Sequence, residues 1–486
     1  MIKNFYLIIL LSLVNCSLFT PKYNKPKISI PKSWNTNESV NNDLNNIAWW
    51  KKFNDANLNK LIEIALNQNN DIQKAIGNIT VAKGNLQQIN MNWIPNIGLG
   101  GIYSLTNTTN SNIDTSNNLI IPPITTQTSK IDNFNFYNYG LIPSYSLNIF
   151  KQLNQQDIAK SNLELNIAAK DAIRMTIISQ VCASYFTLIA TKSQLEIQND
   201  TINKLITLKK SSDASYKYGL ISINEVNNIT QNLLETKVQM LELENNLKLA
   251  QNSLKTLLSN NLESFSFNNS LNNINTENLV IKNLSSEVLN NRPDIKIAEQ
   301  NLKIANANIG VAKSNFFPKI SITSPVGGYS SQLGNLFSDQ GNFWALQIQA
   351  TMPILNLGLY GIIKEAKGQY YVAYYNYIKT VETSFYEVDN NLNNLDKMNK
   401  TINFSANELN LATNTARNNQ LKFKQGLISS PENLNSLIVN NKILQVHYNN
   451  KLKQIQAIIM FYQAIAAGYN YNNSITANFF NDSHDA

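Results

Sequence analysis

The sequence has few of the residues on which most metal centres and many active sites depend. Its 486 residues include two cysteines and two histidines, His447 and His484, too few for a histidine-based metal site. It contains no phosphate-binding Gly-Lys-Ser/Thr loop and no Gly-x-Ser-x-Gly nucleophile elbow. These absences favour a protein that is not an enzyme and that uses no cofactor.

Charged residues are also scarce. They make up 15% of the chain, whereas an average soluble domain has roughly 25%. The net charge is +8, but the lysines are scattered along the chain. A nucleic-acid-binding protein would gather positive charge on one element, so the distribution favours a solvated surface and no nucleic-acid partner.

The N-terminus has the pattern of an export signal. Lys3 precedes a short apolar run at residues 5–13, and Cys16 closes the segment. A transmembrane helix needs about 20 apolar residues, which is more than this run provides. We expect residues 1–15 to be a signal peptide and Cys16 to be the lipidated first mature residue, because the LVNC tetrapeptide ending there resembles a bacterial lipoprotein cleavage box. The alternative is an ordinary signal peptide with an incidental cysteine.

Only Cys182 remains if Cys16 is acylated, so no internal disulfide is expected. Cys182 lies in a strongly helical stretch, and we interpret it as a small core residue. No later window of the sequence looks like a transmembrane helix. An exported chain of this kind is free in the periplasm, anchored by lipid, or crosses the outer membrane as β-strands.

The second half of the chain repeats the first. The sequence NDI at 70–72 precedes WIP at 93–95 by the distance that separates PDI at 293–295 from FFP at 316–318. These matched positions lie 223 residues apart. Further on, YKYGLIS around Gly219 recurs as FKQGLIS around Gly426, 207 residues apart. A long internal repeat governs the whole fold and must be recognised before single elements are assigned.

Each copy is expected to contain helices and two strands in one order. In the first copy, residues 58–260, Asn57 caps a short helix, and a second helix runs from about residue 71 to 92. Alternating strands follow near 97–103 and 134–147, separated by a loop rich in Thr, Ser and Asn. Aromatic residues near the strand ends suit the girdle of a membrane barrel, and an ordinary soluble hairpin is the alternative.

Two long helices complete the first copy. The chain has no proline or glycine from residue 149 to about 217, which allows a helix of about 100 Å at 1.5 Å per residue. Gly219 ends it, and a returning helix at 223–258 carries an apolar heptad seam typical of a coiled coil. The seam consists of Val226, Ile229, Leu233, Thr236, Met240, Leu243, Leu247, Ala250, Leu254 and Leu257.

The second copy, residues 284–469, is expected to repeat this order. Its elements are a helix ending near residue 317, strands at 319–329 and 343–355, a helix at about 360–424, the turn at Gly426, and a helix from Pro431 to Ala467. Residues 16–57 are expected to form a lipidated, extended N-terminal segment with tryptophan anchors, and residues 470–486 a disordered tail.

The strand count implies an assembly. Four antiparallel strands cannot close a barrel, and an open sheet edge is unstable in lipid. We therefore expect an α+β membrane protein in which several copies share one β-barrel, with four strands from each. The long helices would continue this barrel as an α-helical barrel of coiled-coil hairpins.

The repeated motif resembles the signature of the outer-membrane efflux protein family, the TolC-like group, in the lipoprotein branch typified by OprM and NodT. It is carried by RPDI at 292–295 and FFP at 316–318, and WWKKF at 49–53 fits that branch. The resemblance covers about residues 46–469. It implies a homotrimer with a twelve-stranded barrel in outer-membrane lipid and a helical barrel in the periplasm. It also implies a passive exit for drugs or other small substrates, driven by an inner-membrane pump through a periplasmic adaptor.

The same resemblance suggests roles for particular residues. The turns at Gly219 and Gly426 would be periplasmic tips that contact the adaptor. Other positions match acidic pore-facing residues, aromatic constriction residues and helix-to-strand transitions, in that order: Glu225 and Glu432; Tyr216 and Phe423; Pro95 and Pro318. For the two glutamates the alternative is a simple stabilising position in the first turn of a helix, favoured by the helix dipole.

Two departures from the family pattern accompany these assignments. Asn435 stands where a second acid is expected, and Ile428 stands where an arginine is expected. Two other functions are open from the sequence. One is a type I protein-secretion channel, and the other is a periplasmic coiled-coil structural lipoprotein without a pore. A pure coiled coil would not need the two strand pairs.

Overall fold

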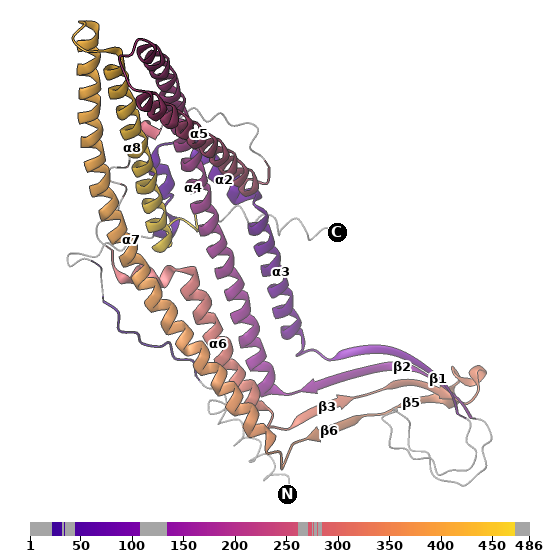
Figure 1. Cartoon of the computed structure of the whole chain (residues 1–486). Helices are drawn as coiled ribbons and strands as arrows, with labels where there is room; N and C mark the ends of the chain where they lie inside the picture. Colours follow the sequence, from indigo (N-terminus) through magenta and orange to yellow (C-terminus); the bar gives the residue numbers. More distant parts are fainter. Residues whose placement is uncertain are drawn as a thin grey trace. The chain divides into compact units, whose positions relative to one another are not determined.

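The computed structural model describes residues 22–31, 34, 44–106, 134–260, 271–274, 276, 279 and 284–471 (Figure 1). Cys16, the signal peptide, residues 107–133 of the predicted loop and the tail beyond residue 471 lie outside these residues. The chain forms two compact units. Unit 1 contains residues 83–161 and 303–371, and unit 2 contains residues 25–82, 162–302 and the chain from 372 onwards. Each unit is described by itself.

Unit 1 contains an antiparallel sheet in which β1 pairs with β2 and the remaining strands follow the order β5-β4-β2-β3-β6. The strands are β1 (Asn96–Thr106), β2 (Phe134–Leu147), β3 (Lys319–Thr323), β4 (Val326–Ser330), β5 (Asn342–Trp344) and β6 (Gln347–Thr351). One-residue 3-10 links aside, the short 3-10 turns η6 (Leu333–Asn335) and η7 (Asp339–Gly341) lie between β4 and β5.

The described sheet therefore has six strands instead of the expected four. β3 and β4 pair with β2 in one continuous register, in which Ser144 lies opposite Thr323 and Leu141 opposite Val326. The interruption falls at Pro325, which has no N–H to donate to a ladder. β6 and β5 pair with β3 and β4 in one register too, so the six strands follow four antiparallel paths.

Apolar side chains line one face of β1 and are exposed to the surroundings of the single chain. Ile97, Leu99 and Tyr103 alternate along the strand and are 66%, 79% and 59% exposed. The period of two places them on the same side of the sheet. A strand face of this kind is costly in water and stable in lipid.

Two helices enter the sheet after matching intervals. α3 (Asn70–Met91) and α6 (Pro293–Ser314) each have 22 residues. Pro95 directly precedes β1, and Pro318 directly precedes β3. Neither proline can continue a helix, because its ring blocks the preceding turn and it lacks a backbone donor.

Four long helices dominate the rest of the chain. They are α4 (Ile149–Lys217), α5 (Ile223–Leu257), α7 (Gly358–Lys424) and α8 (Ser430–Ala464). α5 and α8 each have 35 residues and lie 207 apart along the whole of their lengths. Most of the change from an offset of 223 to one of 207 falls between the strand starts, Asn96 and Lys319, and the helix starts, Ile149 and Gly358.

The long helices pack in a fixed order within unit 2. α5 lies on α4, where Gln198 Nε2 donates to the Thr236 carbonyl over 2.8 Å. α4 lies on α8, where Asn441 Nδ2 donates to Asp200 over 2.7 Å. α8 lies on α7, where Thr413 bonds Asn440. The order is α5, α4, α8, α7, with α5 and α7 at its two ends.

The seam predicted for α5 is confirmed. Six of its ten positions are buried, and the other four are partly buried, while most intervening residues are exposed. Ile229 and Met240 pack on a cluster formed by Ile202, Leu205, Leu208 and Leu233. The heptad spacing therefore identified the face that packs against α4.

The cap predicted for the first short helix is wrong. α2 runs from Ala56 to Gln68, and Asp55 caps it by accepting from the backbone N–H groups of Asn57 and Leu58. Tyr185 donates to the other oxygen of Asp55 over 2.5 Å. The Asn57 prediction missed this because Asp and Asn are nearly equal as caps, and the tertiary contact with Tyr185 selects between them.

The N-terminal and C-terminal parts of unit 2 share an aromatic core. The 3-10 helices η2 (Leu44–Asn46) and η3 (Trp49–Phe53) place Trp49 and Trp50 there, each 1% exposed. Trp49 stacks on Tyr462 with ring centroids 4.8 Å apart. Gly468 adopts φ +83°, and a Cβ there would lie 2.7 Å from Trp50. Glycine is required at that turn.

One described helix contradicts the expectation that no later segment could cross a membrane. By length and composition alone, α4 has an apolar window that could do so. However, 56% of that window is buried inside the protein. A core helix with apolar contacts on several sides has this pattern.

Candidate functional site at the hairpin turns

The turn between α4 and α5 is a Schellman motif. The N–H of Gly219 donates to the Tyr216 carbonyl, and the N–H of Leu220 donates to the Ser215 carbonyl, both over 2.9 Å. Gly219 has φ +69°, a left-handed conformation that costs a side-chain-bearing residue about 1–2 kcal/mol. Leu220 is 74% exposed at the turn.

The turn between α7 and α8 repeats this geometry. Gly426 has φ +72°, its N–H donates to the Phe423 carbonyl, and Leu427 donates to the Lys422 carbonyl, again over 2.9 Å. Helix α8 begins at Ser430, so Pro431 is its second residue and not its first, as the sequence had suggested. Proline fits there because the early N–H groups of a helix have no carbonyl partner within it.

Both glutamates lie in the first turn of the helix that follows. Ser222 caps α5 by accepting from the Glu225 N–H, and Ser429 caps α8 by accepting from the Glu432 N–H, each over 3.3 Å. The Ser-x-x-Glu spacing is that of a capping box. The helix dipole therefore accounts for an acid at each position, whether or not the carboxylates also face a pore.

The aromatic residues flank the same turns. Tyr216 is 46% exposed and Phe423 is 40% exposed, each three residues before the turn glycine. Within the described part of the chain, no hydrogen bond or ion pair joins Tyr216, Phe423, Glu225 and Glu432 to one another. One chain thus presents two similar turns, each with an aromatic ring before it and a carboxylate after it.

Polar contacts between the two hairpins lie next to the turns, and the sequence analysis missed them. Asn441 on α8 is 8% exposed and donates to Asp200 and Thr201 on α4. Gln445 donates to Gln198 Oε1 over 2.5 Å and to the Gln194 carbonyl over 3.3 Å. Asn and Gln at buried helix positions fix register and orientation between helices.

The carboxyl of Asp200 titrates below its ordinary range. Burial by itself would raise its pKa, but hydrogen bonds from Lys204 and Asn441 outweigh that effect and lower it. Asp200 is therefore ionised at neutral pH and holds Asn441 by a charge-assisted hydrogen bond.

His447 is the one histidine within the described residues, and it lies between α8 and α7. Its Nδ1 is 3.1 Å from Ser405 Oγ on α7. Burial, followed by the charge of Lys451 on α8, lowers the pKa of His447 below its ordinary value. The imidazole is therefore neutral at pH 7.

This lowered pKa predicts a loss of stability on acidification. The unfolded chain binds a proton near pH 6.5, before the folded chain does, so stability falls as the pH drops through about 6.5. We expect the urea midpoint to fall between pH 7.5 and 5.5, and His447→Gln to reduce that fall. An equal fall in His447→Gln would assign the pH dependence to other groups.

A buried arginine joins three helices in unit 2. Arg292, 5% exposed, donates to Asp294 over 2.8 and 3.1 Å, to Glu387 over 2.6 Å, and to the Ala464 carbonyl at the end of α8. Ser384 on α7 also donates to Asp294. The RPDI motif thus has a structural role at the start of α6.

The first copy has an equivalent of one of these bonds. Asn69, which is 223 residues before Arg292, donates to the Leu257 carbonyl over 2.9 Å. Leu257 ends α5 and is 207 residues before Ala464, which ends α8. In both copies the side chain before the entering helix therefore binds the last carbonyl of the returning helix.

The remaining candidates have no reactive environment. Cys182 is fully buried, and burial raises the pKa of its thiol, so it is a core residue as predicted. Over the described ranges, no group of three or more His, Cys, Asp or Glu side chains is arranged to hold a metal ion.

The outer membrane efflux protein family model matches residues 61–260 and 284–466 of this chain. The match covers both sets of helices and strands, so the chain belongs to the outer membrane efflux proteins. Its place is therefore the bacterial outer membrane.

Individual relatives agree with this assignment. The chain is 23% identical over 458 residues to nodulation protein T of Rhizobium leguminosarum bv. trifolii, covering 93% of this chain and 94% of that one. It is 26% identical over 485 residues to the solvent efflux pump outer membrane protein SrpC of Pseudomonas putida, covering 97% and 99%. Its fold is similar to the open-state MtrE outer membrane channel of Neisseria gonorrhoeae, with a TM-score of 0.78, 22% identity, and coverage of 93% and 98%.

Proposed function

We propose that this protein is the outer-membrane exit duct of a tripartite efflux system. It would be a passive channel for drugs or other small substrates, driven by an inner-membrane pump through a periplasmic adaptor. The observation that carries the proposal is a sheet with an exposed apolar face in a chain that also contains helices of 69 and 67 residues. A strand face for lipid and helices of about 100 Å suit a duct that crosses one membrane and reaches far from it.

Closure of the sheet requires further copies. Four antiparallel paths leave two open edges, which lipid does not tolerate. Three copies would supply twelve paths, enough for one closed barrel continuous with a helical barrel. The matched helix lengths and the paired bonds of Asn69 and Arg292 support an internal two-fold repeat, with six similar units around the ring.

Lipidation of Cys16 and adaptor contact at the turns complete the proposal. The turns at Gly219 and Gly426 expose Leu220 and Leu427, 74% and 67%, as an adaptor contact would require. Tyr216 and Phe423 would narrow the pore, and Glu225 and Glu432 would line it. A type I secretion channel would share this architecture. The apolar strand face is difficult to reconcile with a structural lipoprotein that has no pore.

The test is conductance of the full-length lipidated protein. We expect detergent-solubilised protein to migrate as a heat-sensitive trimer and to produce single-channel currents in planar bilayers. A folded monomer without conductance would contradict the proposal. Profiles of drug susceptibility and protein secretion in a deletion strain would then separate efflux from type I secretion.

Charge at the turns provides a second prediction. Carboxylate rings from three copies would attract multivalent cations at a narrow mouth. We expect Glu225→Gln combined with Glu432→Gln to weaken cation block from the side of the turns, as measured by single-channel recording. Glu242→Gln with Glu244→Gln, two exposed acids in mid-α5, is the matched control. Unchanged block in the first variant would remove both glutamates from the pore.

A further inference from the structure

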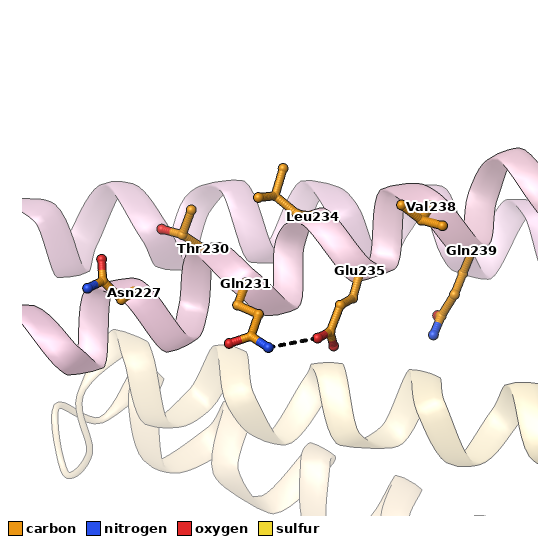
Figure 2. A pocket seen from close by; sticks show the side chains of 7 residues that line it. All are labelled: Asn227, Thr230, Gln231, Leu234, Glu235, Val238 and Gln239. Carbon is orange, nitrogen blue, oxygen red and sulfur yellow. Dashed lines mark hydrogen bonds between the residues drawn. The ribbon is translucent and has the colours of Figure 1, made fainter.

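The helix α5 has a second apolar stripe, opposite to the seam that packs on α4. Leu234, Val238 and Leu241 are 57%, 57% and 64% exposed and recur at spacings of four and three residues. They border a surface groove of about 610 Å³ along α5 (Figure 2). The other residues that line it are Asn227, Thr230, Gln231, Glu235 and Gln239, with Gln231 donating to Glu235 over 3.0 Å.

The equivalent stripe on α8 is covered. Adding 207 to the α5 numbers leads to Leu434, Ile438, Asn441 and Gln445. Leu434 and Ile438 pack on the Ile202, Leu205 and Leu208 cluster of α4 and α5. Asn441 and Gln445 form the hydrogen bonds to α4 described above. The same helix face is therefore covered in the second copy and exposed in the first.

The helix α7 has the complementary exposed stripe. The α4 positions that meet α8 include Asp200 and Thr201, whose equivalents 207 residues later are Asn407 and Glu408 on α7. Both are exposed. Flanking them, Phe404 and Leu411 are 74% and 69% exposed, unusual values for large apolar side chains on a helix.

We infer that α5 of one chain packs against α7 of the next copy, in the arrangement that α8 and α4 have within one chain. This inference rests on the proposed function, in which copies close one ring. α5 and α7 end the helix order, so a head-to-tail contact between them repeats by rotation and closes. In it, Leu234 meets Glu408 as Asn441 meets Thr201, and Val238 meets Thr401 as Gln445 meets Gln194.

Unit 1 contains an independent sign of the same complementarity. Gly310 on α6 approaches α4 so closely that a Cβ there would lie 1.9 Å from Asn154 Oδ1. The equivalents by the two offsets are Gln87 on α3 and Gly361 on α7. Gln87 is exposed, and a Cβ on Gly361 would meet no atom within 4 Å in one chain. A glycine thus again faces a longer polar side chain, with the two exchanged between helices.

Cysteine cross-linking tests this interface. The variant Leu234→Cys with Glu408→Cys, oxidised in the full-length detergent-solubilised protein, should lose its monomer band and form dimers and trimers on non-reducing gels. Their equivalents, Asn441 Nδ2 and Thr201 Oγ1, lie 3.0 Å apart, which is close enough for a disulfide between cysteines. Cys182 is fully buried and should not react, and the parent chain is oxidised alongside to confirm this.

Matched variants make the result decisive. Asn232→Cys with Glu408→Cys places an exposed thiol near the same level of α5 but on another face, and it should remain monomeric on the gel. Val238→Cys with Thr401→Cys is the second pair if the first variant does not fold. Conductance and native mass are measured on the same samples. A conducting trimer without cross-links in a folded pair overturns this interface and leaves the duct, whereas a non-conducting monomer overturns both.

Discussion

Replacing Trp49 with alanine is expected to destabilise the protein by about 3–5 kcal/mol, the usual cost of truncating a fully buried tryptophan. Trp49 is 1% exposed and stacks on Tyr462, with Trp50 and Phe53 against its edge. The cavity would lie where residues near both ends of unit 2 meet. The measurement is the urea midpoint of the detergent-solubilised protein, followed by far-UV circular dichroism.

Trp344→Ala is the matched control. Trp344 is 76% exposed on β5, so its removal should change the free energy of unfolding by less than about 0.5 kcal/mol in detergent. If both variants shifted the midpoint equally, the aromatic core would not be a principal source of stability.

Replacing Arg292 with methionine is expected to destabilise the protein by about 2–4 kcal/mol. The substitution keeps most of the volume but leaves the Ala464 carbonyl without this donor and removes the cation from Asp294 and Glu387. Exposed Arg417 on the same chain provides the control Arg417→Met, for which a change within about 0.5 kcal/mol is expected.

The pH dependence of this difference identifies its cause. Burial would raise the pKa of Asp294, but hydrogen bonds and charge attraction from Arg292 outweigh it and lower that pKa. Asp294 therefore stabilises the fold above its unfolded pKa of about 4, and this stability is lost as the pH falls through the folded pKa. The gap between wild type and Arg292→Met should narrow below pH 4. A constant gap would attribute the loss to packing alone.

Local rules predicted much of this fold. The Gly219 and Gly426 turns, the buried seam of α5, and the strands after Pro95 and Pro318 depend on short stretches of sequence. Glycine is the residue that adopts positive φ at little cost, and proline cannot continue a helix, so each constrains the backbone wherever it occurs. The heptad seam was equally local, since its period alone identifies one face of a helix.

The errors came where distant residues decide. Asp55, not Asn57, caps α2, and the bond from Tyr185 that distinguishes them spans 130 residues. The apolar window of α4 passed unnoticed, and burial inside the protein explains why that helix is so apolar. The four predicted strands appeared as six because Pro325 interrupts a ladder that the pairing with β2 continues in register.

The sequence by itself determined the order of elements, their duplication and the two turns, because these follow from periodicity and backbone preference over a few residues. Only the tertiary structure decided which faces are covered. It showed that Asn441 and Gln445 on α8 are bound by α4, whereas Leu234 and Val238, at the equivalent positions on α5, are exposed. Burial is a property of neighbours far apart in the chain, and no local pattern specifies those neighbours.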